Sequence, residues 1–243
     1  MKSSLIFALV LPLMASTDFA EKMLDSKLTQ AQRNDACFTL RGMATPEAIE
    51  ANSKALRDPK VRSCAEENLR RAGAVDALKA ALADDNSEVR AVAARILGTF
   101  QRPELAPLIA KAGDDSQMLV ATNALEGLSY YEDRSAVPYL LKLAKHTGVV
   151  GSLAMEQLIK LREPQAVAVA RELMKSVDPA DLLAAMRALG TMGEASDIPA
   201  LEDVPKRFPD TTLSGAGRGF GFMPAISLDR AAKTSIEQIR ARQ

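Results

Sequence analysis

The sequence predicts an all-α protein, a right-handed α-solenoid of about six to seven two-helix repeats. Two observations carry this prediction. A fixed pattern of small and apolar residues recurs about every 30 residues. A residue type that commonly begins helices stands at the same distance before most copies of this pattern. The composition agrees, because 243 residues that are 47% hydrophobic and 26% charged supply a sizeable core and exclude wholesale disorder.

The repeated register marks one helix of each repeat. Its apolar marks are Leu40, Leu69, Leu97, Leu125, Leu158, Leu189 and Ile236. An alanine stands four residues before every mark, at Ala36, Ala65, Ala93, Ala121, Ala154, Ala185 and Ala232. These positions and an apolar residue three places after the mark lie on one helix face, where the alanine lets neighbouring helices approach closely. The register predicts helices over 30–42, 59–72, 87–100, 115–129, 148–162, 179–192 and 226–241.

Start signals accompany these predicted helices. Eleven residues before the first six marks stand good N-cap types, namely Thr29, Asp58, Asn86, Asp114, Thr147 and Asp178. Other apolar segments lie between the marked helices, and prolines fall near their starts, at Pro46, Pro103, Pro138, Pro164 and Pro199. Two helices in each period of about 30 residues are typical of an α-solenoid.

Two segments have a distinctive sequence, Asp58-Pro-Lys-Val-Arg-Ser-Cys-Ala and Asp85-Asn-Ser-Glu-Val-Arg-Ala-Val-Ala-Ala-Arg-Ile-Leu-Gly. They resemble HEAT-like repeats of the bacterial, lyase-type family. The resemblance covers residues 21–243, is densest over 46–101, and implies a single HEAT-like repeat solenoid. It implies a fold and no one activity, since such repeats occur in scaffolds, in bilin lyases and in some DNA glycosylases.

The first residues have the pattern of a secretory signal peptide, assigned here to 1–20. Lys2 precedes an apolar run of eleven residues over 5–15, which is far shorter than the roughly 20 residues that a membrane span needs. Cleavage after Ala15 or after Ala20 is compatible with this pattern. We expect an exported, periplasmic or secreted protein with no membrane span in its mature chain. The alternative is an apolar N-terminal helix that packs on the first repeat.

The chain has two cysteines, Cys37 and Cys64, on successive predicted helices. They stand three and five residues before their marks, so one faces forward and the other backward along the stack. In an exported chain, two and only two cysteines favour a disulfide. The alternative is a pair of separate buried thiols.

Charge and rare residues narrow the classes of function. Lysine plus arginine and aspartate plus glutamate both number 31, and this neutral balance argues against nucleic-acid binding. The one histidine, His146, has no ligand-spaced cysteine or carboxylate beside it. We therefore predict no catalytic residue, no metal site and no cofactor.

Three arginines share the position seven residues before the mark: Arg33, Arg62 and Arg90. In HEAT-like repeats such arginines usually pair with aspartates in a structural ladder between repeats. The alternative is a basic strip for an acidic partner, limited to the N-terminal half because the series then breaks.

The last interval between marks is 47 residues, and the excess falls in 205–224, an inserted Gly/Phe-rich loop. It contains Arg218, Phe220 and Phe222. No strand is predicted before the glycines and no Lys-Ser or Lys-Thr follows them, so a phosphate-binding loop is disfavoured. The loop either caps the open end of the core or contacts a partner, since insertions in repeat proteins often gather on a binding face.

The leading hypothesis for function is a non-enzymatic protein–protein interaction or scaffold module that binds an unidentified protein along its helical repeat surface. The expected contact residues are Arg62, Glu66, Arg90, Arg95, Asn123, Glu156 and Arg187, with Arg218, Phe220 and Phe222 from the loop. The alternative is an enzyme or enzyme subunit resembling HEAT-like lyases, which needs a deep pocket with converging titratable groups. The sequence leaves the oligomeric state open.

Overall fold

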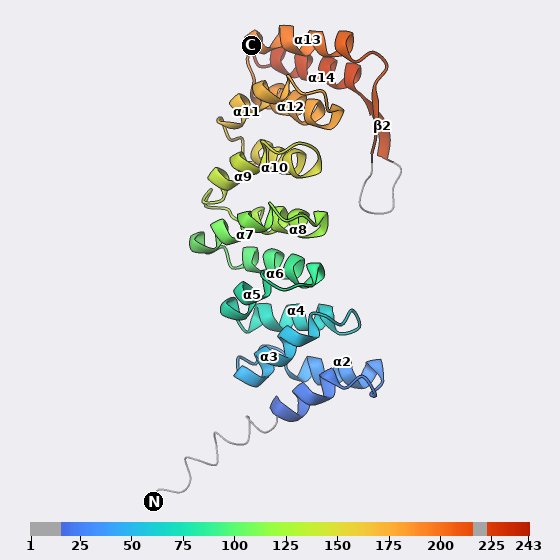
Figure 1. Ribbon diagram of the computed structural model, residues 1–243. Coiled ribbons are helices and arrows are strands. Elements are labelled where there is room, and N and C mark those ends of the chain that lie inside the picture. Colours follow the sequence, from blue (N-terminus) through green and yellow to red (C-terminus); the bar gives the residue numbers. More distant parts are fainter. Residues whose placement is uncertain (1–15, 216–222) are drawn as a thin grey trace, which may run out of the picture. The chain divides into compact units, whose positions relative to one another are not determined.

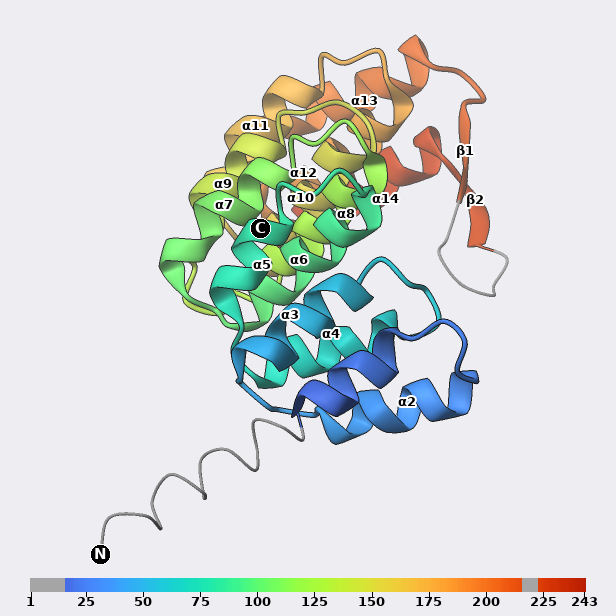
Figure 2. The same ribbon diagram turned by 60° about the horizontal axis from the view of Figure 1, so that its bottom comes forward.

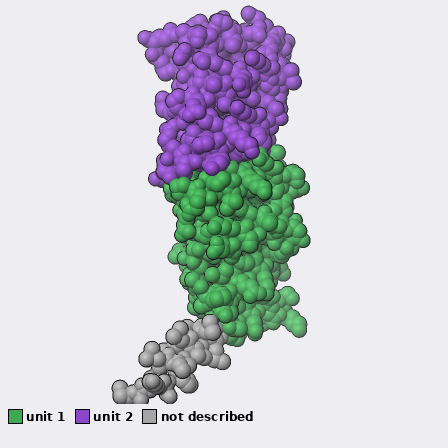
Figure 3. Space-filling view, turned by 60° about the vertical axis from the view of Figure 1, so that its left-hand side comes forward, with its two compact units in different colours: residues 1–131 green, residues 132–243 purple. Residues whose placement is uncertain are grey.

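The computed structural model describes residues 16–215 and 223–243 and divides the chain into two compact units, 1–131 (unit 1) and 132–243 (unit 2) (Figure 3). Helices dominate both units, and the described strands form one two-stranded sheet. The predicted all-α repeat class is confirmed. The single continuous solenoid over 21–243 stays a prediction.

Unit 1 consists of paired helices. Residues 16–24 are helical, and α2 (Gln30–Thr39), α3 (Pro46–Ala55), α4 (Arg62–Arg71), α5 (Val75–Ala81), α6 (Ser87–Thr99), the short 3-10 helix η1 (Pro103–Leu105), α7 (Ala106–Ala112) and α8 (Met118–Leu128) follow. The pairs are α3 with α4, α5 with α6, and α7 with α8. The second helices α4, α6 and α8 pack on one another in chain order (Figures 1 and 2).

Unit 2 repeats this arrangement and adds a hairpin. Its elements are α9 (Val137–Leu143), α10 (Val149–Lys160), α11 (Ala166–Leu173), α12 (Pro179–Met192), the 3-10 helix η2 (Ala195–Asp197), α13 (Ile198–Arg207), strands β1 (Thr212–Gly215) and β2 (Met223–Ser227), and α14 (Leu228–Arg240). Helices α10, α12 and α14 pack in order, backed by α9, α11 and α13. The antiparallel hairpin contacts α14 through β2 (Figure 1).

The predicted register forms the core of both units. All seven marks and all seven alanines before them are buried. The closest helix approach in unit 1 lies between α6 and α8, where a Cβ added at Gly98 would stand 2.1 Å from the carbonyl oxygen of Gly127. Small residues at these positions therefore let the two backbones come into contact.

The helix starts follow the sequence in part. Thr29, Asn86 and Asp178 cap α2, α6 and α12 as predicted, each accepting a hydrogen bond from a first-turn N–H. The helices α4 and α8 begin three residues later than predicted, and α10 begins one residue later. In the first of them, Asp58 accepts the N–H of Lys60 and the guanidinium of Arg33, so its carboxylate stabilises a turn and an ion pair instead of a cap.

The insertion at 205–224 is more regular than the expected loop. Pro205 lies in the last turn of α13, where its missing N–H costs one hydrogen bond near a helix end. Beyond it, Thr212 pairs with Ser227 and Leu213 with Ile226 in the hairpin. The two interpretations of this segment, cap and partner contact, depend on Arg218, Phe220 and Phe222, which lie outside the described residues.

The apolar run at 5–15 also lies outside the described residues. Among the helices that the structure does describe, none combines the length and the hydropathy that a membrane crossing requires.

Candidate functional site

Unit 2 contains a groove of about 680 Å³ on the face formed by α10, α12 and α14, with β2 at one side. Its lining is apolar at Ile159, Leu183, Ile226 and Ala231, charged at Glu156, Lys160, Arg187 and Arg230, and neutral polar at Thr191, Thr234, Ser235 and Gln238. We call it the unit 2 groove.

Rows of residues four apart build the groove. Helix α12 contributes Leu183, Arg187 and Thr191, and α14 contributes Arg230, Thr234 and Gln238. On each helix, these residues stand six before, two before and two after the buried mark. They share one helix face because they are spaced by four residues. Helix α10 supplies the last two positions of the same row, Glu156 and Lys160. The register that buries one side of each helix therefore also aligns the groove on another side.

The groove has a basic rim. Arg187 on α12 donates from Nη1 to Oε1 of Glu156 on α10 at 2.6 Å, so these two charges neutralise each other. Lys160 and Arg230 also line the groove, and their side chains make no ion pair within the described parts of the chain. Two unpaired cations therefore flank a floor to which Ile159 and Leu183 contribute partly exposed apolar surface.

Sequence reasoning located two residues of this site. It proposed Glu156 and Arg187 as contact residues, and the structure brings them together across two helices. It missed Lys160, Arg230 and Leu183. The repeat register could have located them. One helical turn along the same helix face from the position two before the mark, in either direction, lie the positions two after and six before it.

In unit 1, the expected contact residues on the second helices form internal contacts. Arg95 on α6 pairs with Glu66 on α4, the same cross-helix type of pair as in the unit 2 groove. Asn123 on α8 is partly buried and donates from Nδ2 to the carbonyl oxygen of Leu119 at 2.7 Å.

The arginine series forms a ladder between successive repeats, which we define by its three pairs. They are Arg33–Asp58, Arg62–Glu88 and Arg90–Asp115. Arg90 donates from Nε and Nη2 to both oxygens of Asp115, at 2.8 and 3.1 Å. These bonds hold the pKa of Asp115 below its ordinary value.

The arginine ladder supports the structural interpretation of these residues over the basic strip. The side chains of Arg62 and Arg90 are only 16% and 17% exposed. Their role in partner contact stays a prediction.

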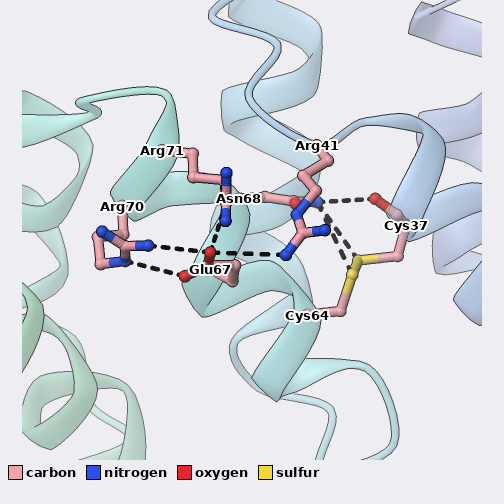
Figure 4. Close-up of polar contacts among 7 residues, drawn as sticks. All are labelled: Cys37, Arg41, Cys64, Glu67, Asn68, Arg70 and Arg71. Atoms are coloured by element: carbon pink, nitrogen blue, oxygen red, sulfur yellow. Dashed lines mark hydrogen bonds and ion pairs between the residues drawn. A yellow bond between two sulfur atoms is a disulfide. The ribbon is translucent and has the colours of Figure 1, made fainter.

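The predicted disulfide between Cys37 and Cys64 is confirmed, and it links α2 to α4 (Figure 4). Asn68 on α4 donates from Nδ2 to the carbonyl oxygen of Cys37 at 2.8 Å and to Oδ1 of Asn52 at 3.0 Å. A covalent bond and a buried amide network therefore fix α2 to the pair formed by α3 and α4.

A dense charge cluster lies beside the disulfide (Figure 4). Arg70 donates to both oxygens of Glu67 at 2.8 and 2.9 Å, Arg71 donates to the same carboxylate, and Arg41 stands 3.7 Å away. The bonds from Arg70 and then Arg71 lower the pKa of Glu67 from 4.5 to about 2. Across residues 16–215 and 223–243, no group of three or more His, Cys, Asp or Glu side chains is arranged to hold a metal ion.

The comparisons with known proteins agree with this architecture. Residues 75–150, from α5 to the start of α10, match the sequence family described as HEAT repeats. This match agrees with the resemblance of the sequence to HEAT-like repeats. No curated protein matches the chain in sequence.

Several solved structures are similar along most of the chain. Human deoxyhypusine hydroxylase is 15% identical over 96% of this chain and 99% of its own, with a TM-score of 0.38. The CpcE–CpcF phycocyanin lyase complex from a Nostoc species is 17% identical over 91% and 93%, with a TM-score of 0.42. A designed armadillo repeat protein in complex with the peptide (KR)4 is 17% identical over 92% and 98%, with a TM-score of 0.43. Likenesses at this level assign no activity to the chain.

Proposed function

We propose that this chain is a non-enzymatic protein-binding repeat module, exported from a bacterial cell, that holds an extended segment of a partner protein in the unit 2 groove. The observation that carries this proposal is the groove itself, in which three stacked helices align an apolar floor and a polar rim. Stacked helices of repeat proteins commonly bind extended segments on such surfaces.

The dimensions of the groove suit an extended chain. Neighbouring packed helices lie about 8–10 Å apart, and an extended peptide advances about 3.3 Å per residue. A segment that crosses α10, α12 and α14 therefore meets a new row of side chains about every third residue. Because rim residues such as Arg187 remain largely exposed, the groove favours a segment that continues beyond it over a small molecule, which a pocket normally encloses.

A binding role also accounts for the charges in the groove better than catalysis. Glu156 and Arg187 neutralise each other at 2.6 Å, so neither is poised as a free acid, base or nucleophile. We assign them to the recognition of a partner and assign no reaction to the groove.

Two features support export. The bond between Cys37 and Cys64 is of a kind that persists in oxidising compartments. The apolar run at 5–15 has the length of a signal peptide core. Together they favour the periplasm or the cell exterior as the place where the partner is met.

Capture of the partner by groove variants tests the proposal. The mature protein and two variants are immobilised, exposed to the envelope fraction of the cell that makes the chain, and the captured proteins are identified by mass spectrometry. Thr234→Trp fills the groove from an exposed position on α14, and Glu172→Trp adds the same ring at an exposed position on α11 outside it. Circular dichroism first confirms that both variants are folded.

We expect at least one protein to be captured by the wild type and by Glu172→Trp, and to be lost with Thr234→Trp. Cross-linking of that protein to α10, α12 or α14 locates the contact. Equal capture by all three forms would overturn the assignment of the groove as the binding site.

A further inference from the structure

We propose that the unit 2 groove selects an acidic extended segment, in which carboxylates are interspersed with apolar side chains. This inference rests on the proposed function and gives its partner a chemistry. It follows from the charges that remain on the rim after internal pairing, and from the helices on which they stand.

The rim has an unbalanced positive charge. Its charged side chains are Lys160, Arg187, Arg230 and Glu156, and Glu156 is already paired with Arg187. Lys160 and Arg230 have no carboxylate partner in the described chain. Unsatisfied cations beside apolar surface attract a segment that carries negative charge and disfavour a basic one.

The positions of the two cations set the spacing of the carboxylates. Lys160 stands on α10 and Arg230 on α14, with α12 between them. Two helix spacings of about 8–10 Å separate them, a span that about five or six extended residues cover. A carboxylate at one position and a second about six residues later therefore face the same side of the segment and reach the two cations.

The floor between the cations takes the apolar side chains of the segment. Leu183 lies on the central helix α12, and Ile159 on α10 also lines the groove. Exposed ion pairs are weak individually and are screened by salt. The floor therefore supplies most of the affinity, whereas Lys160 and Arg230 supply the choice between acidic and basic segments.

Three synthetic peptides test this inference on the full chain. They are fluorescein-labelled repeats of Asp-Glu-Leu, Asn-Gln-Leu and Lys-Arg-Leu, each repeated four times. The acidic and neutral peptides have nearly the same shape and differ in charge, and the basic peptide reverses the charge on longer side chains. Fluorescence anisotropy measures their binding to the wild type, to Thr234→Trp, to the Lys160→Gln/Arg230→Gln variant and to a matched Lys175→Gln/Lys206→Gln variant. The matched variant removes the same charge from exposed positions of unit 2 outside the groove.

We expect the acidic peptide to bind the wild type about tenfold more tightly than the neutral one, and the basic peptide to bind most weakly. The Lys160→Gln/Arg230→Gln variant should lose this preference, and the Lys175→Gln/Lys206→Gln variant should keep it. Raising the salt concentration to about 0.5 M should narrow the difference, because exposed charges are then screened.

The outcomes separate this inference from the proposed function. Binding of the basic or neutral peptide as tightly as the acidic one, or an unchanged preference in Lys160→Gln/Arg230→Gln, would overturn the acidic chemistry. If Thr234→Trp still abolishes binding in that case, the groove remains a peptide-binding site. If no peptide binds, or if Thr234→Trp does not prevent the binding that is measured, both the acidic chemistry and the peptide-binding function of the groove are overturned.

Discussion

Glu67 on α4 shows how much charge one carboxylate can organise in this protein. It accepts hydrogen bonds from Arg70 and Arg71 on its own helix and lies within ion-pair distance of Arg41, which follows α2. The cluster lies beside the disulfide, so charge and covalent bonding act on the same helix contact (Figure 4).

The pKa of Glu67 predicts an acid-sensitive contribution to stability. Its pKa is about 2 in the folded protein, below the ordinary value of 4.5. The carboxylate therefore stabilises the folded state at pH values above 4.5, and this contribution is lost as the pH falls toward 2. We expect Glu67→Gln to lower the free energy of unfolding at neutral pH and to flatten its decline over this acidic range.

Urea unfolding at a series of pH values measures this effect. Glu172→Gln, at an exposed position of unit 2, is the control and should change the pH dependence less. An unchanged acid profile in Glu67→Gln would show that the three arginines do not stabilise the folded state through this carboxylate.

Single residues of the unit 2 groove were predictable where the repeat register points directly at them. Glu156 and Arg187 occupy the same register position on successive helices, and the spacing alone places them on one face. The register also reaches Lys160 and Arg230, but it does not show that they are unpaired, because the pairing of a cation depends on side chains brought near it by folding. Periodicity reports the direction in which a residue points, and it does not report its partners.

At the scale of the element, the tight contact of α6 with α8 depends on glycine. A methyl group at Gly98 would overlap the backbone of Gly127, which has no side chain to move away. We expect Gly98→Ala to destabilise the protein by about 1–3 kcal/mol, the usual cost of overpacking a close contact. Met118→Ala, at an exposed site on α8, should change stability by less than about 0.5 kcal/mol.

Thermal unfolding followed by circular dichroism compares these two variants. Because each repeat is stabilised by its neighbours, the damage from Gly98→Ala should spread to α4 and α7 in hydrogen exchange. A melting temperature equal to that of the wild type would mean that the two helices separate without cost.

The disulfide stabilises the α2–α4 contact. It closes a separation of 27 residues, for which the loss of chain entropy in the unfolded state corresponds to about 3–4 kcal/mol. We expect Cys37→Ser/Cys64→Ser to lose a stability of this order, with the largest increase in hydrogen exchange at α2. Uniform loosening of both units would contradict a local role for the bond.

The helix starts show why element boundaries were only partly predictable. Asn86 and Asp178 cap their helices, but Asp58 has the same residue type at the same register position and does not. Its carboxylate is taken by the N–H of Lys60 and by Arg33, 25 residues earlier in the chain. A residue type identifies a candidate cap, and a competing long-range partner decides the outcome.

At the scale of the whole molecule, the sequence predicted the repeat class because every mark and every alanine of the register is buried. It did not predict the hairpin of β1 and β2, whose short strands pair across an insertion with no repeat counterpart. It also did not predict the division into two compact units, because the register continues unbroken across residues 131 and 132.

The first described residues predict the mature N-terminus of an exported chain. Residues 16–24 are helical, and Ser16, Ala20 and Met23 are buried. Cleavage after Ala15 keeps these buried residues, whereas cleavage after Ala20 removes two of them. We therefore expect the exported protein to begin at Ser16.

Intact mass measurement of the protein recovered from the periplasm or the medium tests this expectation. A chain that begins at Glu21 would contradict the role given to the helical segment. An uncleaved chain confined to the cytoplasm would contradict export.

The arginine ladder has a consequence for how this protein changes length over evolution. Its pairs join residues 25, 26 and 25 positions apart, nearly one repeat. Each repeat inside the ladder contains an acidic residue that pairs with the arginine of the preceding repeat. It also contains an arginine that pairs with the acidic residue of the following repeat. An in-frame duplication or deletion of one repeat in this part of the gene therefore brings matching charges to each new junction in a single recombination event. Lineages could lengthen or shorten this stack without a compensating substitution.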